Sequence, residues 1–386
     1  MKAKQAIILV LILAVLAGAT ALTLRLKQPS GEGLLGRTLL EDLPWQDIAA
    51  VSIRGLEGSV GLAERDGRWV VLEREGYPAD FSRIAALVKD VREAKIGRVF
   101  EPDQETLGRL GLKDPEDHAV QAAEAATLLT LMNAEGERLV EMALGTDKPS
   151  NQGAAAGRYV RLNRLPGVYR VDRSLAVSCR PADWLDKLIL KVAPADISEI
   201  VCREAGVGRV RYRLKRNAPE QSLTLENLPE RYVLDPEKLR RLSDAVSSLQ
   251  MLDLEGPRRS EGSDGGSFPV VIAYRLFNGV VYRIYPGAAC VDEKGCPLRV
   301  AVAWEPQEKD APDDEAAASA AETASEGDAP GEDPSARAAA EAARLEERTF
   351  LVPEWQHQHF VLQVEDLLVA LDEEPDYGHG QGPGRR

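Results

Sequence analysis

One stretch of the chain carries apolar residues at the i, i+3, i+4 and i+7 spacing of a helix with one buried face, and a second stretch repeats most of this pattern. The first comprises Ile84, Leu87, Val88 and Val91, and the second comprises Leu239, Leu242, Val246 and Leu249. Asp80 and Asp235 lie just before the two stretches, where an aspartate carboxylate caps the free N–H groups of a first helical turn. The pattern therefore predicts two helices that begin after residues 80 and 235.

These helices belong to a longer internal repeat. Residues 77–102 align without gaps with residues 232–257, and the first tyrosine, the capping aspartate and the last proline are identical. Alternating apolar and polar residues predict strands around each helix. The predicted strands are 47–54, 59–64, 68–72, 126–133, 139–145, 158–162 and 168–172 in the first half, and 196–203, 207–215, 222–226, 270–278, 281–287, 298–304 and 349–352 in the second. Helical segments near 182–190 and 362–371 are expected to close the halves.

The N-terminus sets the expected compartment. Residues 6–24 carry no charge, are rich in Ile, Leu, Val and Ala, and lie between Lys4 and Arg25. As a helix these residues extend about 28 Å, close to the thickness of a bilayer core. We favour an uncleaved anchor with the bulk of the chain outside the cytoplasm, and a cleaved signal peptide is the alternative.

Together these patterns predict an α+β protein in which one N-terminal transmembrane helix precedes two tandem, related, mostly antiparallel sheet-plus-helix domains. The expected parts are an anchor at 1–27, a juxtamembrane linker at 28–44, a first domain at 45–193, a second at 194–372 and a flexible tail at 373–386.

Charge changes the picture in one segment. The 386 residues include 62 acidic and 48 basic ones, for a net charge of −14. Residues 305–348 hold 14 acidic and four basic residues, so 14 − 4 = 10 of the net negative charges lie there, and Leu345 is their one large aliphatic residue. Such a segment cannot bury enough apolar area to offset its ordering entropy. We expect a disordered, acidic, Ala-rich insertion with a short helix around 337–348.

The four cysteines fit an oxidising compartment. Cys290 and Cys296 flank a turn-like Val-Asp-Glu-Lys-Gly, which favours a local disulfide, with free thiols or a metal site as the alternatives. Cys179 and Cys202 are candidates for a second bridge.

Two further clusters are candidate sites. His357 and His359, beside Glu354, would present metal ligands on one face if the segment were extended, although a solvent-facing edge is the commoner outcome. A run of alternating cations predicts a strand with one basic face, formed by Arg209, Arg211, Arg213 and Lys215. A solvated sheet face is the commonest role of such a strand, and the alternatives are contact with anionic lipid headgroups, an acidic partner or the acidic insertion.

An ordered set of short motifs resembles bacterial membrane-anchored proteins classed as domain of unknown function 4340. The motifs are Trp69, Tyr77-Pro-Ala-Asp80, Leu110-Gly-Leu-Lys-Asp-Pro115, Leu144-Gly145, Arg158-Tyr-Val160 and Asp183-Trp184. The second half lacks an equivalent of Leu-Gly-Leu-Lys-Asp-Pro. The resemblance implies a single-pass protein of the inner membrane, with its bulk in the periplasm and an auxiliary role beside ABC transporters of the gliding-motility type. It brings no catalytic residues.

No metalloprotease, serine hydrolase or phosphate-loop motif is present. We therefore expect a non-enzymatic accessory or scaffold subunit of an ABC-type transport or envelope complex that binds protein partners and needs no cofactor. The acidic balance argues against nucleic acid as a partner. The alternative is an envelope glycan-binding protein or hydrolase that uses a cleft between the repeats, with Trp45, Trp69 and Trp184 as stacking surfaces.

Overall fold

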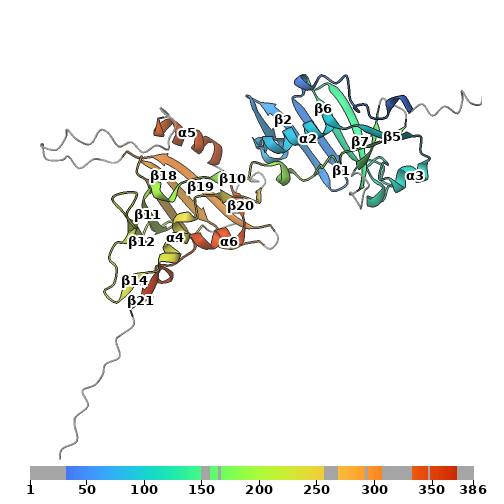
Figure 1. Ribbon diagram of the computed structural model, residues 1–386. Coiled ribbons are helices and arrows are strands. Elements are labelled where there is room, and N and C mark those ends of the chain that lie inside the picture. Colours follow the sequence, from blue (N-terminus) through green and yellow to red (C-terminus); the bar gives the residue numbers. More distant parts are fainter. Residues whose placement is uncertain are drawn as a thin grey trace, which may run out of the picture. The chain divides into compact units, whose positions relative to one another are not determined.

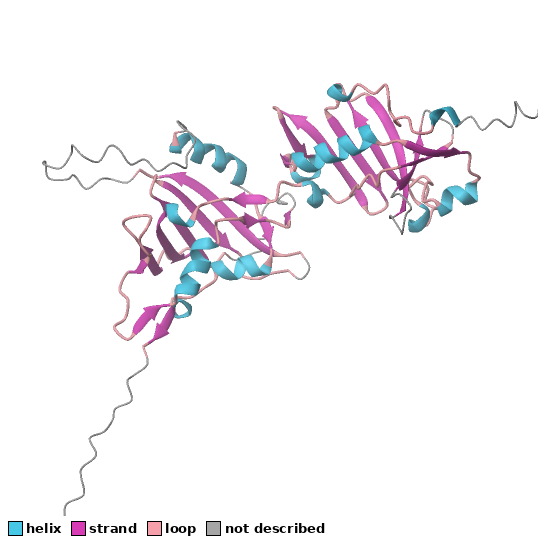
Figure 2. Cartoon of the chain, in the orientation of Figure 1, coloured by secondary structure: helices cyan, strands magenta, loops and turns pink. Residues whose placement is uncertain are grey.

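The fold is that of a computed structural model, which describes residues 32–148, 157–163, 167–255, 268–291, 294–306, 333–346 and 348–371. The chain divides into two compact units, unit 1 (Met1–Asp186) and unit 2 (Lys187–Arg386). Each unit is α+β, and the strands of its sheets pair antiparallel (Figures 1 and 2).

Unit 1 is built on a nine-stranded sheet with the order β4-β3-β2-β1-β6-β7-β8-β9-β5. Its strands are β1 (Ala50–Gly55), β2 (Gly58–Arg65), β3 (Arg68–Val71), β4 (Tyr77–Pro78), β5 (Ile96–Phe100), β6 (Thr127–Met132), β7 (Arg138–Lys148), β8 (Gly157–Leu162) and β9 (Val168–Val171). The α-helices in the described part of unit 1 are α2 (Phe81–Glu93) and α3 (Gln104–Arg109).

Unit 2 is built on an eight-stranded sheet with the order β13-β12-β11-β17-β18-β19-β20-β16. The strands are β11 (Ile197–Glu204), β12 (Val210–Lys215), β13 (Thr224–Leu225), β16 (Asp253–Leu254), β17 (Val270–Leu276), β18 (Val280–Pro286), β19 (Cys296–Trp304) and β20 (Phe350–Val352). Two small ladders pair β10 (Leu188–Leu190) with β15 (Leu249–Gln250), and β14 (Tyr232–Leu234) with β21 (Leu368–Ala370). The helices are α4 (Pro236–Asp244), α5 (Pro334–Leu345) and α6 (Glu354–His357).

The two large sheets share one strand order. The sequence β3-β2-β1-β6-β7-β8-β9-β5 in unit 1 corresponds, strand by strand along the chain, to β13-β12-β11-β17-β18-β19-β20-β16 in unit 2. Helix α2 lies between β3 and β5 along the chain, and helix α4 lies between the equivalent strands β13 and β16. The aligned helices of the repeat therefore occupy equivalent places in two equivalent topologies.

Both predicted N-caps are confirmed. The Asp80 carboxylate accepts a hydrogen bond from the Arg83 N–H at 3.2 Å. The Asp235 carboxylate accepts from the N–H groups of Glu237 at 2.8 Å and Lys238 at 3.2 Å. Each cap satisfies N–H groups that have no partner within the helix, so both helices begin where the sequence predicts.

One face of each sheet forms the main core. In unit 1 alternate residues of the central strands, such as Ile53, Leu129 and Met142, are fully buried, and α2 lies across the sheet with its apolar stripe buried (Figure 1). In unit 2 the Tyr274 hydroxyl donates to the Leu242 carbonyl of α4 at 3.1 Å. The helix therefore covers the face of the sheet to which Tyr274 belongs.

The closing segments differ from the prediction. Near 182–190 the structure has a 3-10 turn (Pro181–Trp184) followed by β10, and near 362–371 it has a 3-10 turn (Glu365–Leu367) followed by β21. Short apolar runs fit either periodicity, and strand pairing decides here. Because β10 pairs with β15 of unit 2, the boundary between the units lies after Asp186 rather than after residue 193.

The expected linker at 28–44 is wrong from Gly36 onward. The Gly36 N–H donates to the Ile96 carbonyl at 2.7 Å, the Ile96 N–H donates to Arg37, and the Leu39 N–H donates to Ala94. Leu39 is also buried. These backbone bonds fix the segment to unit 1.

The acidic insertion is only partly as expected. Residues 307–332 and 347 lie outside the described residues, but α5 is a helix packed on β19, with Ala338 and Leu345 buried. The Arg344 guanidinium donates to the carbonyls of Leu188 and Ile189. The short helix expected around 337–348 is therefore confirmed, although it begins three residues earlier, and its buried contacts offset the ordering entropy.

The predicted anchor at 1–27 and the predicted tail at 373–386 lie outside the described residues. Within the ranges that are described, no helix combines the length and the apolar character needed to cross a membrane.

Substituting Leu345 tests whether α5 belongs to the core of unit 2. Its side chain is fully buried, and truncating a buried leucine to alanine costs about 2–5 kcal/mol. We expect Leu345→Ala to lower the free energy of unfolding of the full chain by this amount in urea denaturation. Ala340→Ser, on the exposed side of α5, is the control and should change it by at most about 0.5 kcal/mol. Equal free energies of unfolding for the two variants would show that α5 is not part of the core of unit 2.

Candidate functional site

The Tyr-Pro-Ala-Asp and Asp-Trp motifs meet in the core of unit 1. The Asp80 N–H donates to the Trp184 carbonyl at 2.8 Å, and the indole N–H of Trp184 donates to the Ser178 carbonyl at 2.9 Å. The Arg83 guanidinium lies 4.9 Å from the centre of the Trp184 ring. Tyr77 and Trp184 are fully buried, so these two motifs hold the start of α2 in place.

The Leu-Gly-Leu-Lys-Asp-Pro motif closes against the Leu-Gly motif. The Thr146 N–H donates to the Leu110 carbonyl at 2.8 Å. A β-carbon at Gly145 would lie 2.3 Å from that carbonyl oxygen, so only glycine permits this approach. The Lys113 ammonium pairs with the Glu124 carboxylate at 2.6 Å. With the motif held in this way, Leu107 and Leu112 pack on Val168, on the sheet face opposite the main core.

Arg158, from the Arg-Tyr-Val motif, ties three segments together. Its guanidinium donates to the carbonyls of Gly145 at 2.8 Å and Leu175 at 2.7 Å. Burial lowers the pKa of Arg158, although nearby Asp147 opposes the shift. The Arg158 side chain therefore joins backbone carbonyls of separate segments. All the motifs described so far stabilise the fold of unit 1.

The order of these motifs agrees with a family match. The sequence model of the family described as Domain of unknown function (DUF4340) matches residues 69–264, half of the chain. The chain belongs to the DUF4340 family. Comparison with curated proteins and with solved structures found no match. The matched region runs from β3 in unit 1 to just beyond β16 in unit 2.

The DUF4340 protein carries an aromatic groove on unit 1, defined here by Trp45, Ile48, Trp69, Phe81 and Val88. The groove has a volume of 800 Å³ and lies between the 43–48 segment, β3 and helix α2. Phe81, the first residue of α2, is 62% exposed. An exposed aromatic side chain in a hollow that combines aromatic and polar residues is a common feature of binding sites.

The three tryptophans proposed as stacking surfaces separate into two groups. Trp45 and Trp69 are partly exposed and line the aromatic groove together. Trp184 has no exposed surface, so its predicted role in glycan stacking is wrong.

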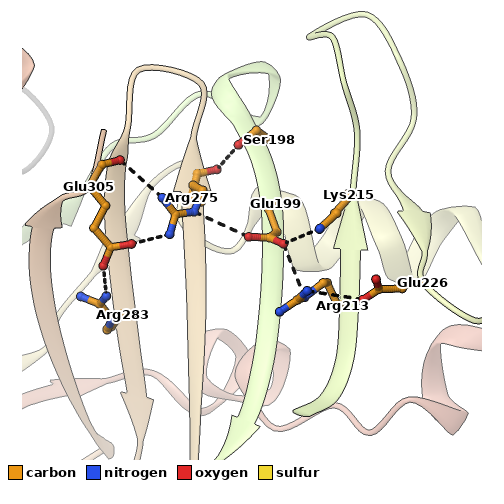
Figure 3. A network of polar contacts seen from close by, with 8 residues as sticks. All are labelled: Ser198, Glu199, Arg213, Lys215, Glu226, Arg275, Arg283 and Glu305. Atoms are coloured by element: carbon orange, nitrogen blue, oxygen red, sulfur yellow. Dashed lines mark hydrogen bonds and ion pairs between the residues drawn. The ribbon is translucent and has the colours of Figure 1, made fainter. Parts of the chain in front are cut away.

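A network of ion pairs, the charge ladder, crosses the second face of the unit 2 sheet (Figure 3). Successive ion pairs connect Glu226, Arg213, Glu199, Arg275, Glu305 and Arg283, and Lys215 is also paired with Glu199. The separations that involve Glu199 are 3.5–3.6 Å. Partly exposed pairs of this kind each contribute roughly 0.2–1 kcal/mol.

The predicted basic face of the second half is neutralised by the ladder and its neighbours. Arg209 and Arg211 pair with Glu204, while Arg213 and Lys215 pair with Glu199. Arg211 and Arg213 also line a hollow of 710 Å³, but Glu226 and Glu365 line it too. The expectation of a strongly basic surface is wrong, because the neighbouring segments supply carboxylates that the sequence of one strand does not reveal.

The cysteines of the second half form a Cys–His cluster with one histidine. Cys290 and Cys296 form a disulfide with a Cα–Cα distance of 4.0 Å, and His357 lies beside it. Nε2 of His357 is 2.9 Å from the Gly287 carbonyl oxygen. Burial lowers the pKa of His357, against the opposing effects of this hydrogen bond and of Glu354. His357 ends α6 and His359 lies in the next 3-10 turn, so the extended segment that would join their faces is not formed.

Cys179 and Cys202 are free thiols, so the second bridge is not formed. Burial raises the pKa of Cys179, against the hydrogen bond from Thr127, and burial also raises the pKa of Cys202. A raised pKa reduces the thiolate fraction. Neither thiol has the properties of an activated nucleophile.

The pH dependence of stability tests the charge ladder. Burial alone would raise the pKa of Glu305, but hydrogen bonds and charges from Arg283 and Arg275 outweigh burial and hold it below its ordinary value of 4.5. A carboxyl with a lower pKa in the folded state stabilises the fold above its unfolded pKa. That contribution is lost as the pH falls through the folded pKa.

We therefore expect the advantage of the wild type over Glu305→Gln to shrink as the pH falls from 7 through about 4.5 and below. Urea denaturation at a series of pH values measures this difference. Glu230→Gln changes an exposed carboxyl outside the ladder and serves as the control. Parallel pH profiles for the wild type and Glu305→Gln would show that the ladder contributes nothing.

Proposed function

We propose that this DUF4340 protein is a non-enzymatic, membrane-anchored accessory or scaffold subunit of an ABC-type transport complex in the bacterial envelope, and that it acts by binding a protein. In this proposal residues 1–27 form a single-pass anchor in the inner membrane. The two units, with their shared strand order, are tandem copies of one domain in the periplasm. The observation that carries the proposal is the aromatic groove.

The chemistry of the groove suits an apolar protein segment. Trp45, Trp69 and Phe81 supply large, rigid contact surfaces, and aromatic residues dominate the energetics of protein interfaces. The rim adds the cations Lys89 and Arg92, while the one acidic lining residue, Glu93, is paired with Arg173 at 2.7 Å. The groove therefore favours a segment with apolar anchors and a flanking carboxylate.

The same observations weaken an enzymatic role for the groove. Glycoside hydrolysis uses a pair of carboxylates on either side of the scissile bond, and Glu93 is the one carboxylate among the described residues that line the groove. Glycan binding without hydrolysis is the second candidate, since Trp45 and Trp69 in one groove suit sugar stacking.

Partner capture from crosslinked membranes tests the proposal. We expect the full chain to recover a transporter subunit after mild solubilisation, and Trp45→Ala/Phe81→Ala to lower the recovery at least ~10-fold, as the loss of two hot-spot residues would. Trp355→Ala removes an equally exposed aromatic residue, 62% exposed, from unit 2 and is the matched control.

Three results would contradict the proposal. The first is that the wild type recovers no transporter subunit, and the second is that the double variant recovers as much of it as Trp355→Ala. The third is that no protein partner is recovered and the double variant loses binding to envelope glycan, which would favour the second candidate.

A further inference from the structure

The Cys–His cluster brings together two segments that are remote in the sequence. Cys290 is exposed in the loop after β18, whereas Cys296, at the start of β19, is fully buried. His357 is 5% exposed at the end of α6. One ligand atom from each of the three residues lies within 4.8 Å of the other two, close enough for all three to contact one ion after small movements.

The fold holds two of these ligands on one rigid frame. Cys296 is opposite Val352 in the β19–β20 ladder. One residue after β20, helix α6 begins at Glu354, and it ends at His357. Cys290 lies on the adjacent turn, which is closed by the hydrogen bond from the Val291 N–H to the Gly295 carbonyl at 3.0 Å. The β19–β20 ladder therefore fixes Cys296 and the start of the helix that carries His357.

The hydrogen bond made by His357 suits a metal ligand. When Nε2–H donates to the Gly287 carbonyl, the lone pair of the imidazole is on Nδ1. A hydrogen bond from one ring nitrogen to a backbone carbonyl is the arrangement that orients metal-bound histidines and fixes their tautomer. Two thiolates and one imidazole are a donor set that Zn²⁺ prefers, with a fourth position for water or another ligand.

We infer that the Cys–His cluster is a reducible zinc site, in which the disulfide is the oxidised, metal-free state. Reduction requires a dithiol. One thiolate of the dithiol attacks the exposed Cys290 sulfur, the Cys290–Cys296 bond breaks, and Cys296 leaves as a thiolate. The second thiol of the dithiol then displaces Cys290, so the reductant becomes a disulfide and the cluster gains two electrons and two protons. Zn²⁺ then binds both sulfurs and His357, and releases the two thiol protons.

The inference is independent of the aromatic groove, which belongs to the other unit. The test uses the full chain in detergent, without a histidine tag, reduced with a phosphine and titrated with Co²⁺ under anaerobic conditions. We expect one Co²⁺ per chain, thiolate-to-metal charge-transfer absorption, and displacement of Co²⁺ by Zn²⁺. The oxidised chain should bind none.

Variants assign the ligands. Cys290→Ser and His357→Gln should each weaken binding by at least ~100-fold, more than the loss of an outer partner does. His359→Gln and Cys179→Ser/Cys202→Ser, which leave the cluster intact, should bind as the wild type does. Thermal unfolding of the oxidised His357→Gln protein checks that it is folded. Failure of the reduced wild type to bind Co²⁺, or unchanged affinity in Cys290→Ser or His357→Gln, would overturn the inference.

Discussion

A β-sheet has two faces, and each unit must satisfy the face that its main helix leaves uncovered. In both units the first face is apolar and buried, under α2 or α4. Unit 1 covers part of its second face with the Leu107–Leu112 segment packed on Val168. In unit 2 the charge ladder pairs charged side chains on the second face. One topology therefore has two different solutions to the same constraint.

Most residues of the DUF4340 motifs make structural contacts within unit 1. Gly145 permits the approach of Leu110, Arg158 joins backbone carbonyls, and Trp184 lies in the core. Trp69 is the exception, because it also lines the aromatic groove beside α2. The Cys–His cluster beside α6 lies outside these motifs. A shared scaffold with unlike surfaces is well suited to an accessory protein, since fold and function are carried by different residues.

The sequence predicted the α+β fold, the two helix starts and the long strands, because capping and alternation are local signals. It missed short strands such as β10 and β16, which exist only through pairing with distant partners. The short helix predicted around 337–348 is present as α5, and it begins at Pro334, with Ala338 and Leu345 buried. For the candidate sites, Trp45 and Trp69 were recognised as residues but not as neighbours, and His357 carried no signal of its contact with the cysteines.

The central claim is that the aromatic groove, and not the second sheet face of unit 2, is the binding surface. Photo-crosslinking in living cells tests this directly, with a photoreactive residue in place of Ala85 or Ala303. Ala85 lines the groove. The alternation of side chains along β19 places Ala303 on the second face. The account predicts a crosslink from position 85 to a transporter subunit and none from position 303. A crosslink from position 303 alone would contradict it.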